Sequence, residues 1–142
     1  MTSVGILKDK GKKVWSVRAN QTIYEALQML VTHKIGAVVV REEGGKIEGI
    51  VSERDVMRVC FHNPENFSRL PVKKVMTKCV VVAKPSDSIE ELMEVMTQNR
   101  VRHLPVLEDG ELQGLVSIGD VVKAGLKESV ENNKQLMEYI SH

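Results

Sequence analysis

The sequence predicts an α+β fold built from two copies of one unit. Residues 14–55 align onto residues 80–120 with an offset of 66, which becomes 65 after one deletion near Gly44. Each copy carries the signals of a helix, two short apolar strands joined by a Gly-containing turn, and a second helix. The chain has 142 residues, the size of one compact domain, so we expect the two copies to share one core.

The first helix of each copy is predicted to begin at a capping box, formed by Thr22 with Glu25 and by Ser88 with Glu91. Apolar residues then recur at i, i+3, i+4 and i+7, so each helix should bury one face. These stripes are Ile23, Ala26, Leu27 and Leu30 in the first copy and Ile89, Leu92, Met93 and Met96 in the second.

Two apolar runs follow each of these helices and predict a small hairpin. The expected strands are residues 37–41 with 47–51 and residues 104–107 with 112–116. A second helix is expected from Ser52 and from Ser117. The first repeat is expected over residues 1–62 and the second over residues 77–126. A connector, residues 63–76, joins them and ends in a short helical turn, and a C-terminal helix is expected over residues 127–142.

The composition argues against several classes of partner. The chain has 20 basic and 19 acidic side chains, a formal net charge of +1, and only 4% aromatic residues, so no nucleic-acid or anionic-membrane partner is expected. A cluster of Lys8, Lys10, Lys12 and Lys13 alternates with Asp and Gly and favours a solvated loop. Neither a membrane span nor a secretory signal is recognisable, so a cytoplasmic location is expected.

No metal site and no catalytic centre are predicted. The cysteines, Cys60 and Cys79, form no C-x-x-C motif, and His62 and His103 are not at metal-ligand spacing from them, so both thiols are expected to be reduced. Leu115 occupies the place of the first glycine of a nucleophile elbow, and no phosphate-loop, dinucleotide or zinc-protease motif occurs. We therefore expect a protein that is not an enzyme.

One motif occurs complete in both copies: Gly-x-Val-Ser-x-x-Asp, at residues 49–55 and 114–120. It predicts a strand that ends at Ser and a helix whose third residue is Asp. A carboxylate there can accept hydrogen bonds from the two hydroxyls of a ribose, and the helix N-terminus offers N–H groups to a phosphate. The alternative is that Ser-x-x-Asp is only a capping box. Its duplication at the same place in both copies favours the ligand-binding interpretation.

These residues resemble the cystathionine β-synthase (CBS) domain family, and the two copies resemble a CBS pair, or Bateman module. The resemblance spans roughly residues 4–126 and includes Val-Met-Thr at 75–77, residues 99–106 and Ser-Glu-Arg-Asp at 52–55. It implies two βαββα units packed sheet to sheet about a pseudo-twofold axis. It also implies clefts for an adenosine-containing ligand such as AMP, ADP, ATP, NAD or S-adenosylmethionine, and a homodimer formed by stacking two modules.

The resemblance also implies roles for individual residues. Asp55 with Ser52, and Asp120 with Ser117, would each hold a ribose. Residues at the start of the first hairpin strand would line the adenine and phosphate region: Gly36, Ala37, Arg102, His103 and, within the same motif, Pro105. Backbone groups would reach the clefts from Thr77 and Cys79 and, at the other cleft, from Val14 and Trp15. Arg54 and Arg102 are the candidates for phosphate.

The function expected from the sequence is an adenosine-nucleotide sensor that regulates an unidentified partner protein. The alternative is a protein-interaction scaffold whose clefts bind no ligand.

Overall fold

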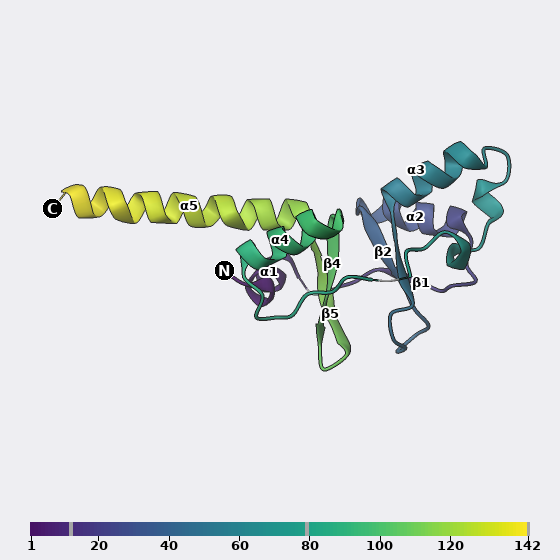
Figure 1. Cartoon of the computed structure of the whole chain (residues 1–142), viewed down its shortest axis with the longest axis horizontal. Helices are drawn as coiled ribbons and strands as arrows, with labels where there is room; N and C mark the ends of the chain where they lie inside the picture. Colours follow the sequence, from purple (N-terminus) through teal and green to yellow (C-terminus); the bar gives the residue numbers. More distant parts are fainter. Residues whose placement is uncertain (12, 79, 142) are drawn as a thin grey trace. The chain divides into compact units, whose positions relative to one another are not determined.

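A computed structural model of the chain describes residues 1–11, 13–78 and 80–141 (Figure 1). The chain divides into two compact units. The Asp55 unit comprises residues 13–81 with 109–112, and the Asp120 unit comprises residues 1–12, 82–108 and 113–142. Helices and two small sheets make up these units, which confirms the predicted α+β class.

The Asp55 unit contains a three-stranded sheet in the order β1-β2-β3. Strand β1 pairs parallel to β2, and β2 pairs antiparallel to β3. Helix α2 connects β1 to β2 and helix α3 follows β3, so the order is βαββα. The elements are β1 (Ser16–Val17), α2 (Ile23–His33), β2 (Ala37–Val40), β3 (Gly49–Ser52), α3 (Glu53–His62) and the 3₁₀ turns η1 (Phe67–Arg69) and η2 (Val72–Lys74).

One apolar core joins α2 and α3 to the sheet. The predicted stripe of α2 contributes Ile23, Ala26 and Leu30, all buried, and Val38 and Val51 meet it from the strands. The helix starts where its capping box predicts: the Glu25 N–H donates to Thr22 Oγ1 at 3.2 Å, and the Glu25 carboxylate accepts from the Thr22 N–H. The local sequence therefore sets the start of α2, and burial fixes its orientation on the sheet.

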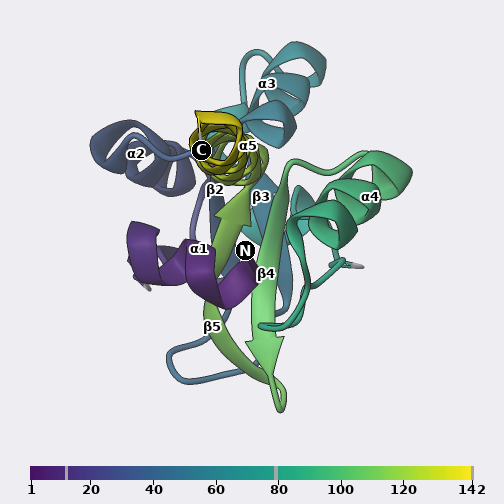
Figure 2. The same cartoon turned by 90° about the vertical axis from the view of Figure 1, so that its left-hand side faces the viewer.

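The Asp120 unit contains the β4–β5 hairpin with α1 and α4 beside it (Figure 2). Ala83 forms a parallel bridge to Val106, at the positions equivalent to Val17 and Val40 of the β1–β2 pair. The repeat is therefore preserved down to strand register. The elements are α1 (Ser3–Lys10), α4 (Ile89–Asn99), β4 (His103–Glu108), β5 (Glu111–Ser117) and α5 (Ile118–Ser141).

Helix α1 corrects one expectation. The lysine-rich start was predicted to be a solvated loop, but residues 3–10 are helical because Ile6 and Leu7 are buried in the Asp120 unit. The first backbone amides of the helix are also satisfied, since the N–H groups of Ser3 and Val4 donate to carbonyls of residues 87 and 85 at 2.9 and 3.0 Å. The first ten residues thus pack within the Asp120 unit, although the sequence assigned them to the first repeat.

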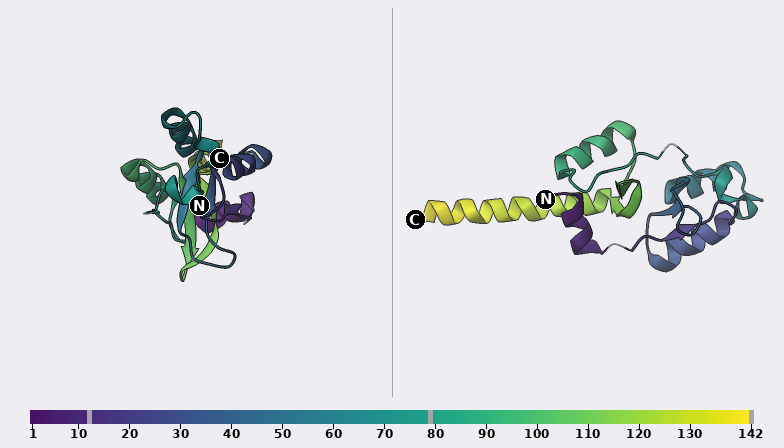
Figure 3. Two further views of the ribbon diagram at one scale, coloured as in Figure 1. Left: turned by 90° about the vertical axis from the view of Figure 1, so that its right-hand side faces the viewer. Right: turned by 90° about the horizontal axis from the view of Figure 1, so that it is seen from below.

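Helix α5 is continuous from residue 118 to residue 141, so no break separates the second helix of the repeat from the C-terminal segment. Its first turns contact α4 and α1, and its C-terminal part runs away from the rest of the unit (Figure 3). Val130, Met137 and Ile140 are exposed there. Among the described residues, no helix is long and apolar enough to cross a membrane.

Candidate ligand-binding sites

The duplicated motif of the Asp55 unit lies at the junction of β3 and α3. Asp55 Oδ2 accepts hydrogen bonds from the Ser52 N–H at 2.9 Å and from the Ser52 hydroxyl at 3.1 Å, and the Asp55 N–H donates to Ser52 Oγ at 3.3 Å. The capping box weighed as the alternative is therefore present. The other carboxylate oxygen, Oδ1, lies 3.6 Å from Nη1 of Arg58. The side chain of Asp55 is 11% exposed.

The start of β2 lies beside this carboxylate. Ala37 is paired with Ser52 across the β2–β3 ladder, and the carbonyl of Gly36 accepts from the Glu53 N–H at 2.9 Å. Four of the predicted site residues, Gly36, Ala37, Ser52 and Asp55, therefore meet at one end of the sheet.

Thr77 closes the open edge of β3. Its N–H donates to the Ile50 carbonyl at 2.9 Å, and its carbonyl accepts from the Ile50 N–H at 3.1 Å. A Cβ on Gly49 would lie 2.8 Å from the Thr77 carbonyl oxygen, so this close approach requires glycine at the first position of the motif. Arg54 is exposed on the first turn of α3.

The motif glycine of the second repeat has a different neighbour. A Cβ on Gly114 would lie 2.5 Å from Cδ2 of Leu7, a buried residue of α1. Both glycines therefore make room for a segment packed across the hairpin: the end of the connector in the Asp55 unit and the N-terminal helix in the Asp120 unit.

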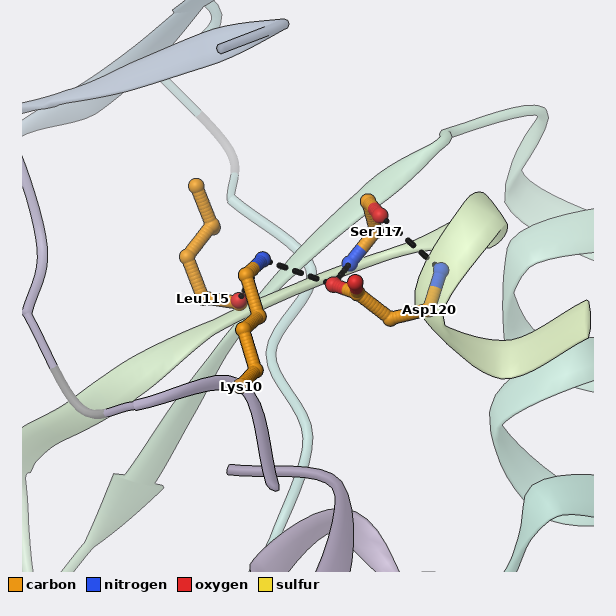
Figure 4. Close-up of polar contacts among 4 residues, drawn as sticks. All are labelled: Lys10, Leu115, Ser117 and Asp120. Atoms are coloured by element: carbon orange, nitrogen blue, oxygen red, sulfur yellow. Dashed lines mark hydrogen bonds and ion pairs between the residues drawn. The ribbon is translucent and has the colours of Figure 1, made fainter. Parts of the chain in front are cut away.

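The motif of the Asp120 unit has the same cap and one additional partner (Figure 4). The Ser117 N–H donates to Asp120 Oδ2 at 2.9 Å, and the Asp120 N–H donates to Ser117 Oγ at 3.1 Å. Lys10 Nζ donates to the same Oδ2 atom at 2.6 Å and to the carbonyl oxygen of Leu115 at 2.9 Å. Sequence reasoning missed this role of Lys10, because the two partners lie 110 residues apart.

The contacts of Asp120 change its pKa. Burial of the carboxyl favours the neutral form, but the hydrogen bonds from Lys10 and Ser117 and the charge of Lys10 outweigh it, so the pKa of Asp120 lies below its ordinary value of 3.8. The carboxylate is therefore charged at neutral pH.

Removing the ammonium group of Lys10 should lower the unfolding free energy only at pH values where Asp120 is charged. At about pH 7, Lys10→Met is expected to lower the unfolding free energy by up to about 1 kcal/mol, because the pair is partly exposed. A depressed folded pKa contributes stability above the unfolded pKa and loses it as pH falls through the folded value. The difference between the two proteins should therefore shrink below about pH 4. Urea unfolding of both proteins at about pH 7 and below about pH 4 measures this difference in unfolding free energy. Lys8→Met is the charge-matched control on α1. An equal difference at both pH values would contradict this role.

The other predicted residues of the second repeat lie in β4 or directly before it. The Arg102 carbonyl accepts from the Ile118 N–H at 2.8 Å, which repeats the bond at Gly36, and the Arg102 side chain is exposed. His103 is half-buried. Pro105 is buried, and its carbonyl accepts from the Ala83 N–H at 2.8 Å.

Two further predicted residues, Val14 and Trp15, lie at the start of the Asp55 unit. Val14 is half-buried. Trp15 stacks on His33, with ring centroids 3.4 Å apart. Cys79 lies outside the described residues. The described residues hold no cluster of three or more potential metal ligands, and Cys60 is a free, exposed thiol.

Two units that repeat a helix, a hairpin and a second helix, each with an aspartate in the first turn of the helix after the hairpin, define a tandem-domain protein of mixed helix and strand. The sequence profile of the CBS domain matches residues 10–62 and 72–127. The chain therefore belongs to the CBS domain family and carries a CBS pair.

Individual relatives agree with this assignment. The chain is 33% identical over 144 residues to "CBS domain-containing protein CBSX3, mitochondrial" of Arabidopsis thaliana. The alignment covers 95% of this chain and 69% of that protein. Among solved structures, the chain resembles the crystal structure of the CBS-domain containing protein ATU1752 from Agrobacterium tumefaciens, with a TM-score of 0.85. The two sequences are 41% identical, and the match covers 87% of this chain and 98% of that one. A likeness of fold alone links the chain to the CBS domain pair of MJ0100, solved with 5′-methylthioadenosine and S-adenosylmethionine. That match is 22% identical, with a TM-score of 0.77, covering 87% of this chain and 98% of that one.

Proposed function

We propose that this chain is a regulatory module that binds an adenosine-containing ligand and thereby changes its affinity for a partner protein. The observation that carries the proposal is the pair of equivalent aspartates. Each is mostly buried, with Asp55 11% and Asp120 22% exposed, and each lies where a strand ends and a helix begins. A carboxylate in that position can accept both hydroxyls of a ribose, while the helix N-terminus favours an anion. The adenosine ligands of MJ0100, a protein of the same fold, support this ligand class.

The residue roles follow from this placement. Asp55 and Asp120 accept the ribose hydroxyls, with the hydroxyls of Ser52 and Ser117 beside them. Arg54 and Arg102 are exposed cations on the elements that flank the two carboxylates, and each can contact a phosphate. Regulation, rather than catalysis, is the proposed activity, and the cytoplasm is its proposed location.

Isothermal titration with AMP, ADP, ATP, NAD and S-adenosylmethionine tests this function. At least one ligand is expected to bind with a Kd below roughly 1 mM, and to raise the melting temperature because it binds only the folded state. If none binds, the sensor proposal fails and the chain is better explained as an interaction scaffold. To regulate a partner, the ligand must bind one arrangement of the module more tightly than another. A difference of about 1 to 3 kcal/mol in binding free energy would change the affinity for the partner five- to 150-fold.

The homodimer implied by the family resemblance has a candidate surface on the Asp55 unit. Helices α2 and α3 border an apolar groove of about 560 Å³, and Val31 and Met57, each 69% exposed, lie at its edge. The same helices expose Tyr24 and Phe61. A twofold axis allows one such surface to cover itself on a second copy, so we propose that this face joins two chains.

Light scattering coupled to size exclusion tests the dimer. Val31→Glu should convert it to a monomer, because the substitution places a charge in an apolar contact. Thr32→Glu is the matched control, since the neighbouring position points about 100° away around the helix and should leave the dimer intact. A wild-type chain that elutes as a monomer at all concentrations would contradict the proposal.

A further inference from the structure

The two equivalent carboxylates have different counter-ions. Asp55 lies 3.6 Å from Arg58 on its own helix, whereas Asp120 is held at 2.6 Å by Lys10 of α1. In the repeat alignment Arg54 corresponds to Gly119, so the first turn of α5 lacks a cation at that position. Lys10 therefore supplies from the N-terminal helix a charge that the second motif does not contain.

Lys10 also occupies a position that main chain fills in the other unit. The carbonyl of Ile50 in β3 accepts from the Thr77 N–H, and the equivalent carbonyl of Leu115 in β5 accepts from Lys10 Nζ at 2.9 Å. The ammonium group thus bridges the strand edge and the carboxylate (Figure 4). Two independent contacts place it at the point where a ribose would meet Asp120.

The ammonium competes with a ribose for the same acceptor. Asp120 Oδ2 already accepts from the Ser117 N–H and from Lys10, which together use the two lone pairs of that oxygen. At Asp55 the second donor to Oδ2 is the hydroxyl of Ser52, which can rotate to another acceptor when a ligand arrives. A diol that binds both oxygens of Asp120 must displace the ammonium hydrogen-bonded to Oδ2 at 2.6 Å, whereas the cation beside Asp55, Arg58, lies 3.6 Å from Oδ1 and is largely exposed.

We propose that Lys10 determines the ligand specificity of the Asp120 site by exchanging its carboxylate partner for an anionic group of the ligand. The inference rests on the proposed function. A neutral nucleoside breaks the Lys10–Asp120 ion pair and offers the ammonium no new partner. A ligand with a phosphate offers a charge-assisted hydrogen bond to the released ammonium, which its flexible four-carbon stem allows it to follow. The Asp120 site therefore favours adenosine phosphates over adenosine.

The test measures the ratio of the adenosine Kd to the AMP Kd by titration calorimetry. An Asp55→Asn background weakens the other site while its side-chain oxygen can still accept from the Ser52 N–H. In that background, Lys10→Met is expected to tighten adenosine binding and weaken AMP binding, so that the ratio falls about tenfold or more. Lys8→Met removes the same charge from an exposed position on the same helix and should leave the ratio unchanged.

The outcomes separate the two proposals. If AMP binding requires Asp120 but the ratio is the same with Lys10→Met, the specificity role is wrong and the proposed function stands. If neither AMP nor adenosine binds to any variant, the specificity role of Lys10 is wrong, and the proposed function then depends on the titrations with ADP, ATP, NAD and S-adenosylmethionine. The ion pair itself is tested without ligand by carboxyl NMR titration, in which Lys10→Met should raise the pKa of Asp120. An unchanged pKa would overturn the inference, and circular dichroism confirms that each variant is folded.

Discussion

Leu7→Ala is expected to lower the unfolding free energy by about 2 to 5 kcal/mol, the range for truncating a buried leucine. Leu7 lies in the N-terminal segment that the sequence assigns to the first repeat, yet it is only 2% exposed and packs against Gly114 in the Asp120 unit. Its loss leaves a cavity beneath α1 and weakens the attachment of the helix that carries Lys10.

Urea unfolding measures the effect, and two variants calibrate it. Val4→Ala truncates an exposed residue of the same helix and should change stability by less than about 0.5 kcal/mol. Leu92→Ala truncates a fully buried residue of α4 and should match Leu7→Ala. If Leu7→Ala behaves like Val4→Ala instead, α1 is not packed on the Asp120 unit in solution.

The elements that could be predicted are those with local signals. Thr22 and Glu25 are three residues apart, so the sequence alone determines that they can form a cap, and the apolar stripe that follows requires only a helical period. The observed strands differ from the predicted ones by one or two residues at their ends. Hairpin ends depend on how far the ladder extends, which the apolar pattern does not determine.

The docking of α1 could not be predicted, because its cause is not local. A helix of eight residues is too short to be stable alone, and this one forms because Ile6 and Leu7 are buried by residues from the other end of the chain. The contact between Lys10 and Asp120 is hidden for the same reason. No period or spacing in a single sequence relates positions 110 residues apart.

The candidate site was partly predictable. Duplication of the motif identified Asp55 and Asp120, and the structure places both at strand-to-helix junctions with the caps that were weighed as the alternative to ligand binding. The glycines of the motif have a packing cause that emerges only in three dimensions, since Gly49 faces Thr77 and Gly114 faces Leu7. The ligand roles of these residues stay predictions.

Substituting both aspartates with alanine is expected to weaken adenosine-ligand binding roughly 100-fold, the largest effect on binding that we predict. At each site the carboxylate would lose two hydrogen bonds from ribose hydroxyls. At about 1.5 kcal/mol per bond to a charged group, the loss of binding free energy is about 3 kcal/mol per site. Asp55→Ala and Asp120→Ala alone each remove one site, so calorimetry shows which cleft holds a given ligand. The double variant leaves neither site.

The capping role of the same side chains must be separated from ligand binding. Each alanine also removes half of a capping box, at a cost of about 0.5 to 2 kcal/mol of stability, which could weaken binding by loosening the helix. Glu25→Ala is the matched control, because Glu25 occupies the same third position in the Thr22 box of α2 and has no proposed ligand contact. Its pKa is lowered by hydrogen bonds from Gln21 and Thr22, so it too contributes as a charged cap.

Glu25→Ala should therefore reduce stability to a similar extent and leave ligand affinity unchanged. Asp55→Asn and Asp120→Asn provide the complementary comparison, because the side-chain oxygen can still accept from the serine N–H while the charge is lost. Binding that falls with Asn as well as with Ala, but not with Glu25→Ala, assigns the effect to the carboxylate. Binding that tracks stability across all these variants would reduce the duplicated motif to a pair of helix caps, and the ligand would have to be sought elsewhere on the molecule.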